Sequence, residues 1–304
     1  MISIIIPTYN RPVLLQSCLE AMTRLQYPKE HFEVVVVDDG GNVDLDPVIG
    51  ALRGALSVRL VKQENTGPGG ARNNGVAHAT GKFIAFIDDD CSPFEDWLTV
   101  LARRLEQDSS RIYGGHTLNA LESNVFTSAS QSLIDYLYSY YNGDAEKARF
   151  FTANNMAMDR NLFLTSGGFD ISFTEASGED RELCDRWLHL GGGLSFVPEA
   201  RILHRHELNL GSFLKQHFIY GTGAWRFREC KRLRDRVRPK LEPLVFYVNL
   251  MRHACMKKLH RPFLLSLLLV LSQVANFAGF VWAKFKELNP FASRSNHAVK
   301  ANRS

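Results

Sequence analysis

Three consecutive aspartates, Asp88, Asp89 and Asp90, directly follow the apolar run at residues 83–87. Carboxylates this close repel one another, and each favours its protonated form unless a cation lies among them. Mg2+ and Mn2+ prefer oxygen ligands and are often held by one or two carboxylates together with substrate phosphates. The triplet therefore indicates a metal that holds a phosphorylated ligand at a strand end. Taken alone, it leaves open the alternative of a solvated acidic loop.

Strand and helix signals alternate through the first 115 or so residues, which predicts the elements that position this triplet. Strands are expected at residues 3–6, 33–37, 58–62 and 82–87, and helices at 12–24, 47–56, 67–79 and 95–106. Because each crossover is a helix, we expect a parallel, doubly wound sheet. Ligands of such sheets bind at the carboxyl ends of the strands. The polar residues expected at that edge are Thr8, Tyr9, Asn10, Asp38, Asp39, Asn65, Asp88, Asp89 and Asp90.

Two common phosphate-binding motifs are absent from the sequence. A dinucleotide fingerprint belongs after the first strand, but Gly67 and Gly69 come after the third, with Arg72 where the last glycine belongs. No Walker A sequence is present either. In the second half we expect a helix at 125–142 and strands at 150–159 and 194–203. Between these strands lie Gly168-Phe169-Asp170 and Gly178-Glu179-Asp180, with Leu183, Trp187 and Leu190 following at helical spacing.

Composition describes an ordinary globular protein. The 304 residues are 45% hydrophobic and 22% charged, with a net charge of +4, which is enough chain for a large α/β domain and an appendage. The five cysteines lack any CxxC spacing, so we expect neither a zinc site nor a disulfide framework, and a reducing compartment. Residues 1–6 have no basic region before them and are expected to be a strand, not a signal peptide.

Five segments in order carry a resemblance to a known family. They are Ser3-Ile4-Ile5-Ile6-Pro7-Thr8-Tyr9-Asn10-Arg11, Val36-Val37-Asp38-Asp39-Gly40, Ala71-Arg72-Asn73-Asn74-Gly75, Phe86-Ile87-Asp88-Asp89-Asp90, and the later Gly168-Phe169-Asp170 with Gly178-Glu179-Asp180. Together with a histidine after the last strand, they resemble family 2 glycosyltransferases over residues 1 to about 225. The resemblance implies the A-type glycosyltransferase fold and a sugar nucleotide as donor.

The resemblance also implies roles for individual donor-site residues. Pro7, Thr8 and Tyr9 would line the nucleoside pocket, with Tyr9 stacked on the base and Asn10 and Asn65 at the same edge. Asp39 would accept the base N–H, consistent with a uracil, and Arg72 would lie by the nucleotide. Asp88 would face the ribose and share the Mg2+ or Mn2+ with Asp90, the expected direct ligand, and His204. Asn154 and Asn155 match a segment that lines the donor–acceptor cleft.

Asp180 matches the general base of the family, in which transfer is a single displacement with inversion, and Glu179 is the second candidate. A carboxylate within hydrogen-bond reach of the acceptor hydroxyl is what such a reaction needs. Ser177-x-x-Asp180 is also a capping box, and a helix N-terminus would favour the ionised form of Asp180. Both roles can hold together. For His204 and His206, a surface or core role remains open, and Cys91 is expected to be a packing residue.

The C-terminal part has two apolar segments after a basic block. Residues 226–240 contain eight Lys or Arg against Glu229 and Asp235, which favours an anionic partner. Residues 263–283 are uncharged and long enough to cross a bilayer, although basic residues flank them on both sides. Residues 244–256 form a shorter segment. Three alternatives stay open: a membrane-embedded or interfacial helix pair, an oligomerising hairpin, and a buried core helix.

From these observations we expect a catalytic domain at 1–225, divided at 115/116 into nucleotide-sugar-binding and acceptor halves, then a membrane-associated helical region at 226–290 and a disordered tail at 291–304. The expected activity is metal-dependent, inverting transfer from a nucleoside diphosphate sugar, UDP-linked, to a glycan or lipid-linked acceptor. Polysaccharide or glycolipid assembly at the cytoplasmic face of the cell membrane is the expected setting, with no nucleic acid partner. A sugar nucleotidyltransferase would need a Gly-rich loop after the first strand, and a non-catalytic family member would be expected to lack the acidic residues.

Overall fold

The computed structural model describes residues 1–237, 242–256 and 262–288 of the chain. The expected tail at 291–304 lies outside these residues. The described part forms one eight-stranded sheet in the order β3-β2-β1-β4-β7-β6-β8-β5. Its strands are β1 Ile2–Thr8, β2 Phe32–Asp39, β3 Val58–Gln63, β4 Phe83–Phe86, β5 Cys91–Pro93, β6 Arg111–Asn119, β7 Met156–Asp159 and β8 Gly193–His204. The helices are α1 Pro12–Thr23, α2 Asp46–Leu52, α3 Gly67–His78, α4 Trp97–Gln107, α5 Val125–Tyr141, α6 Arg160–Thr165, α7 Glu179–His189, α8 Leu210–Asp235, α9 Leu244–Met256 and α10 Pro262–Leu288.

The first half of the sheet confirms the expected parallel, doubly wound order. β1 pairs in parallel with β2 and β4, and β2 pairs in parallel with β3. Beyond β4 the sheet is mixed, because β7 runs antiparallel to both β4 and β6. The strand expected at 150–159 is wrong in length. Only Met156–Asp159 is strand, since residues 153–155 form a short 3-10 turn in which the Thr152 hydroxyl donates to Asn154 Oδ1 at 2.8 Å.

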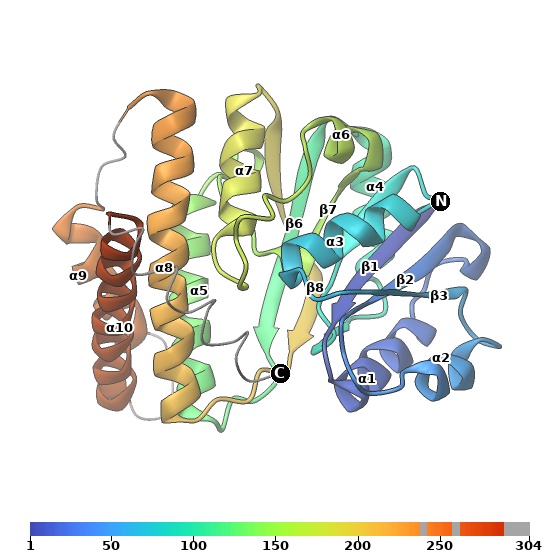
Figure 1. Ribbon diagram of the computed structural model, residues 1–304, viewed down its shortest axis with the longest axis horizontal. Coiled ribbons are helices and arrows are strands. Elements are labelled where there is room, and N and C mark those ends of the chain that lie inside the picture. The colour runs from blue at the N-terminus through green and yellow to red at the C-terminus, as the bar shows by residue number, and fades with distance from the viewer. Residues whose placement is uncertain (238–241, 257–261, 289–304) are drawn as a thin grey trace, which may run out of the picture.

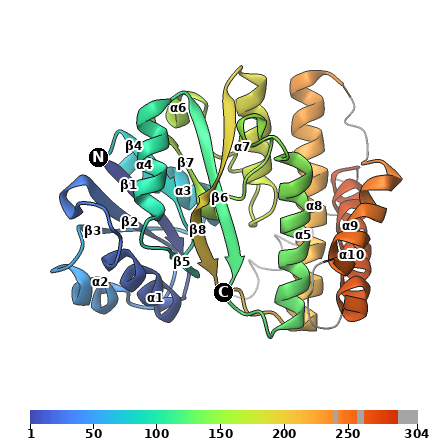
Figure 2. The same ribbon diagram turned by 180° about the vertical axis from the view of Figure 1, so that it is seen from behind.

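Helices cover both faces of the sheet (Figure 1, Figure 2). Alternate strand residues point to opposite faces, so Ile4 and Ile6 pack with α1 and α4 on one side. Ile5, Val35 and Val37 pack with α3 and α7 on the other. Two apolar layers therefore hold the strand ends in fixed positions.

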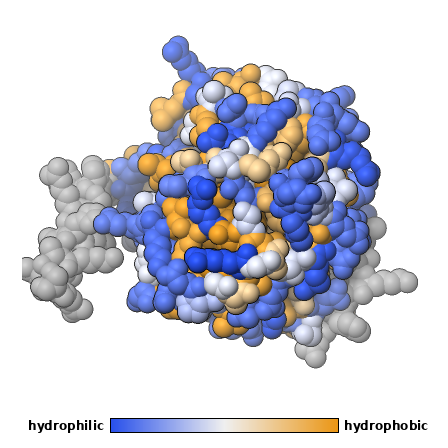
Figure 3. All heavy atoms as spheres, turned by 90° about the vertical axis from the view of Figure 1, so that its right-hand side faces the viewer, coloured by the Kyte–Doolittle hydropathy of each residue, from blue (hydrophilic) through white to orange (hydrophobic). Residues whose placement is uncertain are grey.

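The β3 edge of the sheet is exposed but charged. Arg59 and Lys62 of β3 are both exposed, and Lys62 Nζ is 3.2 Å from Asp46 Oδ2 of α2. Figure 3 shows this end of the molecule, where hydrophilic side chains are interspersed among hydrophobic ones. Charged edge residues disfavour strand pairing with another chain.

A group of helices lies at the opposite end of the molecule from β3 (Figure 1). α8 runs without a break across residue 225, where the sequence placed a domain boundary. α10 packs along α8 and α5, burying Leu265, Leu268 and Leu269. The helical group is thus attached directly to the acceptor half of the expected catalytic domain.

Candidate active site

The carboxyl ends of β1 and β4 meet at one edge of the sheet, as the parallel order requires. There the Thr8 hydroxyl donates to Asp89 Oδ2 at 2.7 Å. Arg11 Nη1 lies 3.2 Å from carboxylate oxygens of both Asp89 and Asp90. Burial raises the pKa of Asp89 to about 6, although Arg11 opposes the shift. The acidic triplet is therefore a mostly buried, partly neutralised cluster, and the solvated-loop alternative is wrong.

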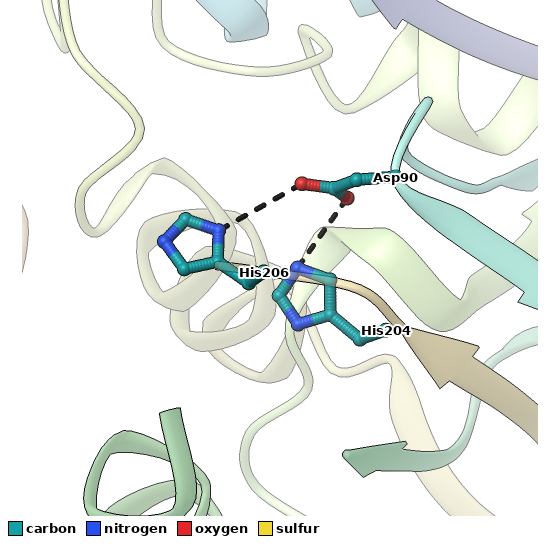
Figure 4. Close-up of side chains that lie close together, drawn as sticks. All are labelled: Asp90, His204 and His206. Carbon is teal, nitrogen blue, oxygen red and sulfur yellow. Dashed lines mark ion pairs between the residues drawn. The ribbon is translucent and has the colours of Figure 1, made fainter. Parts of the chain in front are cut away.

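Asp90 faces two histidines from the end of β8 (Figure 4). The antiparallel pairing of Cys91 with His204 between β5 and β8 brings them together. His204 Nε2 is 3.3 Å from Asp90 Oδ1, and His206 Nδ1 is 3.7 Å from Asp90 Oδ2. Burial alone would raise the pKa of Asp90, but the hydrogen bonds from His204 and His206 hold it well below its usual range. Burial lowers the pKa of His204 and the adjacent Asp90 raises it, with a net upward shift.

These three residues fit a divalent cation. One ligand atom from each of Asp90, His204 and His206 lies within 4.8 Å of the other two. A carboxylate oxygen with two imidazole nitrogens suits a transition ion such as Mn2+ better than Mg2+, which prefers oxygen alone. His206, which the sequence left unassigned, belongs to this cluster, whereas Asp88 lies outside it.

Asp88 instead joins a chain of charges that crosses the site. Arg72 Nη2 lies 2.7 Å from Asp88 Oδ1, and Arg72 Nη1 lies 3.2 Å from Glu179 Oε1. The Arg72 and Glu179 side chains are each 4% exposed, while Asp88 is 30% exposed. Asp88 is therefore held at the surface of the site by a buried cation. Arg72 links it to the start of α7.

Asp180 lies in the first turn of α7, after Gly178, whose φ of 89° is a conformation that favours glycine. The capping box expected from Ser177 and Asp180 is wrong: Gly178 is the N-cap, and the Ser177 hydroxyl donates to Ile219 O of α8 at 2.7 Å. The helix end favours the ionised form, as expected, but its effect is outweighed. Burial and the charge of Glu179 raise the pKa of Asp180 to about 7, against the backbone amide of Arg181.

The expected nucleoside-pocket residues divide into exposed and structural ones. Tyr9 is 50% exposed, as a ring that stacks on a base must be, and Pro7 is half-buried at the end of β1. Asp39 accepts hydrogen bonds from the backbone amides of Thr66 and Gly67, at 2.9 and 3.0 Å, and so holds the start of α3. Asn65 Nδ2 donates to Asp39 O, and Asn10 exchanges hydrogen bonds with Asn42. Asn10, Asp39 and Asn65 shape the loops around this pocket.

Two further expected residues are buried behind the acidic cluster. Asn155 is fully buried, accepts a hydrogen bond from Trp97 Nε1 at 2.8 Å and donates to Ala200 O at 2.9 Å. Asn154 Nδ2 points to Cys91 Sγ at 3.9 Å, and Cys91 is buried, as expected of a packing residue.

The sequence did not identify Arg11 as a site residue. It lies inside the first motif, but only the fold shows that it reaches Asp89 and Asp90.

Comparison with known proteins shows which family the chain belongs to. The sequence pattern described as "Glycosyl transferase family 2" matches residues 3–166. The chain belongs to this glycosyltransferase family. Glycosyltransferase AglE of Haloferax volcanii is 32% identical over an alignment of 242 positions that covers 73% of this chain and 72% of AglE. Hyaluronan synthase of Pasteurella multocida is 29% identical over 67% of this chain, but the match spans 24% of that longer protein.

Solved structures show the same fold. Mannosyltransferase PcManGT from Pyrobaculum calidifontis, in complex with GDP-Man and Mn2+, superposes with a TM-score of 0.65 at 17% identity, over 90% of this chain and 86% of that one. TarS of S. aureus, residues 1–349, superposes with a TM-score of 0.56 at 17% identity, over 95% and 91% of the two chains. The mixed sheet with helices on both faces is therefore the A-type glycosyltransferase fold.

Proposed function

We propose that this glycosyltransferase is an inverting, metal-dependent enzyme that transfers a sugar from a nucleoside diphosphate sugar, UDP-linked, to a glycan or lipid-linked acceptor. The observation that carries the proposal is the Asp90, His204 and His206 cluster at the carboxyl ends of the strands. The crevice at this edge is where doubly wound sheets bind nucleotides. Relatives crystallised with GDP-Man and Mn2+, or with UDP-GlcNAc, support a sugar nucleotide as donor.

On the donor side, Tyr9 offers an exposed ring for the base, and Asp88 is held in place by Arg72. Asp90, His204 and His206 would hold Mn2+ or Mg2+, which as a Lewis acid neutralises the charge of the leaving diphosphate. Arg11 lies against the carboxylates of Asp89 and Asp90 and partly neutralises them when no cation is bound.

On the acceptor side, Asp180 is the proposed base. Its raised pKa, about 7, matches the working pH of a group that must take up a proton from the acceptor hydroxyl. Attack by that oxygen on the anomeric carbon, opposite the diphosphate, breaks the bond to the diphosphate in one step and inverts the configuration. Glu179 is unsuited to this role because both its oxygens are engaged, by Arg72 and by the Ser177 amide.

We further propose that the acceptor lies at a membrane. α10 is long and apolar enough to cross or anchor to one, which supports membrane association. The proposed setting is polysaccharide or glycolipid assembly at the cytoplasmic face of the cell membrane. The shared feature of such acceptors is a sugar or lipid-phosphate head near a bilayer.

The test is a thermal-shift screen of UDP-GlcNAc, UDP-glucose, UDP-galactose and GDP-mannose, each with and without Mn2+. Binding raises the melting temperature by mass action, so a shift with one nucleotide that depends on Mn2+ is the expected result. Proton NMR of the transferred sugar then gives the anomeric configuration. No Mn2+-dependent shift with any of the four sugars, or retention of configuration, would contradict the proposal.

A further inference from the structure

Arg11 lies in the turn between β1 and α1, beside the proposed metal site. Asn10, which has a φ of 55°, turns the chain there, and its side chain is held by two hydrogen bonds with Asn42. Arg11 is the N-cap residue of α1 and is followed by Pro12. These local contacts hold its backbone, whereas its long side chain is 49% exposed. The guanidinium group is therefore free to change its direction without disturbing the fold.

The guanidinium group makes both of its contacts with the acidic cluster through one nitrogen. Nη1 of Arg11 lies 3.2 Å from Asp89 Oδ1 and 3.2 Å from Asp90 Oδ2, and these carboxylates are 4% and 6% exposed. Within the described part of the chain, neither Nε nor Nη2 of Arg11 donates a hydrogen bond to another residue. Most of the donor atoms of this side chain are thus available to a ligand.

One oxygen of Asp90 is needed both by Arg11 and by a bound cation. His206 Nδ1 lies 3.7 Å from Asp90 Oδ2, which is the same oxygen that Arg11 Nη1 contacts. A cation held by this oxygen and His206 therefore lies close to the guanidinium group. Arginine keeps its charge at every working pH and offers no acceptor atom, so it repels a cation and cannot help to bind it. Arg11 in its observed position thus opposes the binding of a cation alone.

A diphosphate group reverses the sign of this effect. Its oxygens accept hydrogen bonds from a guanidinium group in a two-pronged arrangement, and its negative charge offsets the repulsion between Arg11 and the cation. The charge of Arg11 therefore disfavours the cation alone but favours the cation together with a diphosphate. Coupling of this kind is reciprocal, because each ligand must raise the affinity for the other by the same factor.

We propose that Arg11 couples the binding of the divalent cation to the binding of the donor diphosphate. Without ligands, Arg11 occupies Asp90, and when the cation takes its place the guanidinium group turns to the diphosphate. This rests on the proposed function, because it takes Asp90, His204 and His206 to be the cation site. After transfer, the return of Arg11 to Asp89 and Asp90 favours the release of the cation together with the nucleoside diphosphate.

The test measures Mn2+ binding to the full chain, from the electron paramagnetic resonance signal of free Mn2+, first alone and then with UDP. Arg11→Gln is expected to bind Mn2+ about tenfold more tightly than the wild type when no nucleotide is present, because one repelling charge is removed. UDP is expected to raise the Mn2+ affinity of the wild type by a factor about ten or more times larger than in Arg11→Gln. Arg11→Lys keeps the charge and should bind Mn2+ alone as the wild type does.

Arg24→Gln is the matched control, because it removes the same charge from the exposed C-cap position of α1. Its Mn2+ affinity should equal that of the wild type, with and without UDP. Tighter Mn2+ binding in Arg11→Gln would also distinguish coupling from a structural role, since damage to the acidic cluster would weaken the binding.

Two further results separate this inference from the proposed function. Unchanged or weaker Mn2+ affinity in Arg11→Gln, or an equal effect of UDP on the variant and the wild type, would overturn the coupling while leaving the proposed metal site intact. A wild type that binds no Mn2+, with or without UDP, would overturn the proposed metal dependence and the coupling with it.

Discussion

Asp180 is subject to two opposing effects in the first turn of α7. The helix N-terminus favours its charged form, whereas burial and the neighbouring Glu179 favour the neutral one, and the pKa rises to about 7. A base must be ionised to act, so transfer is expected to increase with pH up to about 7. In Asp180→Asn this dependence should disappear and kcat should fall by about 10²–10⁴. Donor affinity should change by less than about threefold. Steady-state kinetics from pH 5.5 to 8.5 measure this, with Glu175→Gln, exposed in the preceding loop, as control.

The same raised pKa has a consequence for stability. The ordinary pKa of this carboxyl group is 3.8, and in the folded protein it is about 7. Between about pH 4 and about pH 7 the folded protein therefore holds a proton on Asp180 that the unfolded chain has released. Stability from this group is full below about pH 4 and is lost as the pH rises through about 7. Relative to the wild type, Asp180→Asn is therefore expected to gain in melting temperature between pH 5 and pH 8. A difference that does not vary with pH would contradict the raised pKa.

The proposed metal site is tested at Asp90. With UDP and Mn2+ at 100 times Kd, the wild type is expected to gain about 2.7 kcal/mol, and a variant that binds 100-fold more weakly only about 0.4 kcal/mol. We expect Asp90→Asn to show the smaller value and to lose its dependence on Mn2+, because the carboxylate between His204 and His206 is removed. Thermal unfolding measures both. Asp96→Asn, six residues on and with no capping hydrogen bond, should behave as the wild type. Full Mn2+ dependence in Asp90→Asn would refute the assignment.

At the scale of elements, the crossing of α8 and α10 depends on two glycines. A Cβ on Gly221 would lie 1.9 Å from Asn276 O, and one on Gly279 would lie 1.9 Å from Phe218 O. Gly221→Ala is therefore expected to destabilise the protein by about 1–3 kcal/mol, as overpacking does. Gly50→Ala, in the exposed helix α2 with nothing within 4 Å of its Cβ, should instead stabilise it by about 0.4–1 kcal/mol. Urea unfolding compares the two. Equal effects would mean that the crossing is not tightly packed.

Elements and site residues differ in how far the sequence predicts them. The strands β1, β2 and β4 could be predicted, because apolar periodicity and breakers are local signals and parallel order gathers their ends. Three features could not be predicted. The contacts of Arg11 and the Arg72–Glu179 contact join residues that are 78 or more positions apart in the chain. The role of His206 depends on the pairing of β5 with β8. The length of β7 was misjudged because Thr152 and Asn154 form a local hydrogen bond that competes with the strand.

At the scale of the whole molecule, α10 has two apolar faces. One packs on α8 and α5, whereas Phe263, Val270, Val274 and Phe277 are exposed on the other at helical spacing. Only 28% of its most apolar stretch is buried, so the core-helix alternative is wrong.

The basic block at residues 226–240 offers fewer unpaired charges to an anionic partner than its sequence indicates, since Lys231 and Arg234 of α8 are paired with Asp185 of α7. Because the charged helix α8 lies along α10, α10 would have to separate from α8 in order to cross a bilayer. No such separation is needed if α10 lies in the plane of the membrane.

The outer face of α10 therefore supplies the last prediction. Val270, Val274 and Phe277, which are 47%, 61% and 68% exposed, are replaced together by glutamine, which keeps the helix propensity. If this face lies on a membrane, the wild type should sediment with vesicles of phosphatidylglycerol and phosphatidylethanolamine, and the triple variant should remain in solution with an unchanged melting temperature. The matched control makes the same replacement at Val13, Ile171 and Leu190, which lie in other parts of the chain and are 74%, 64% and 62% exposed. This control should sediment as the wild type does. The alternative outcome is a wild type that stays in solution as a dimer and a triple variant that is a monomer. That result would establish the face as an interface between two copies of the chain. An exposed apolar area of this kind is covered either by lipid or by a second chain, because its exposure to water is unfavourable.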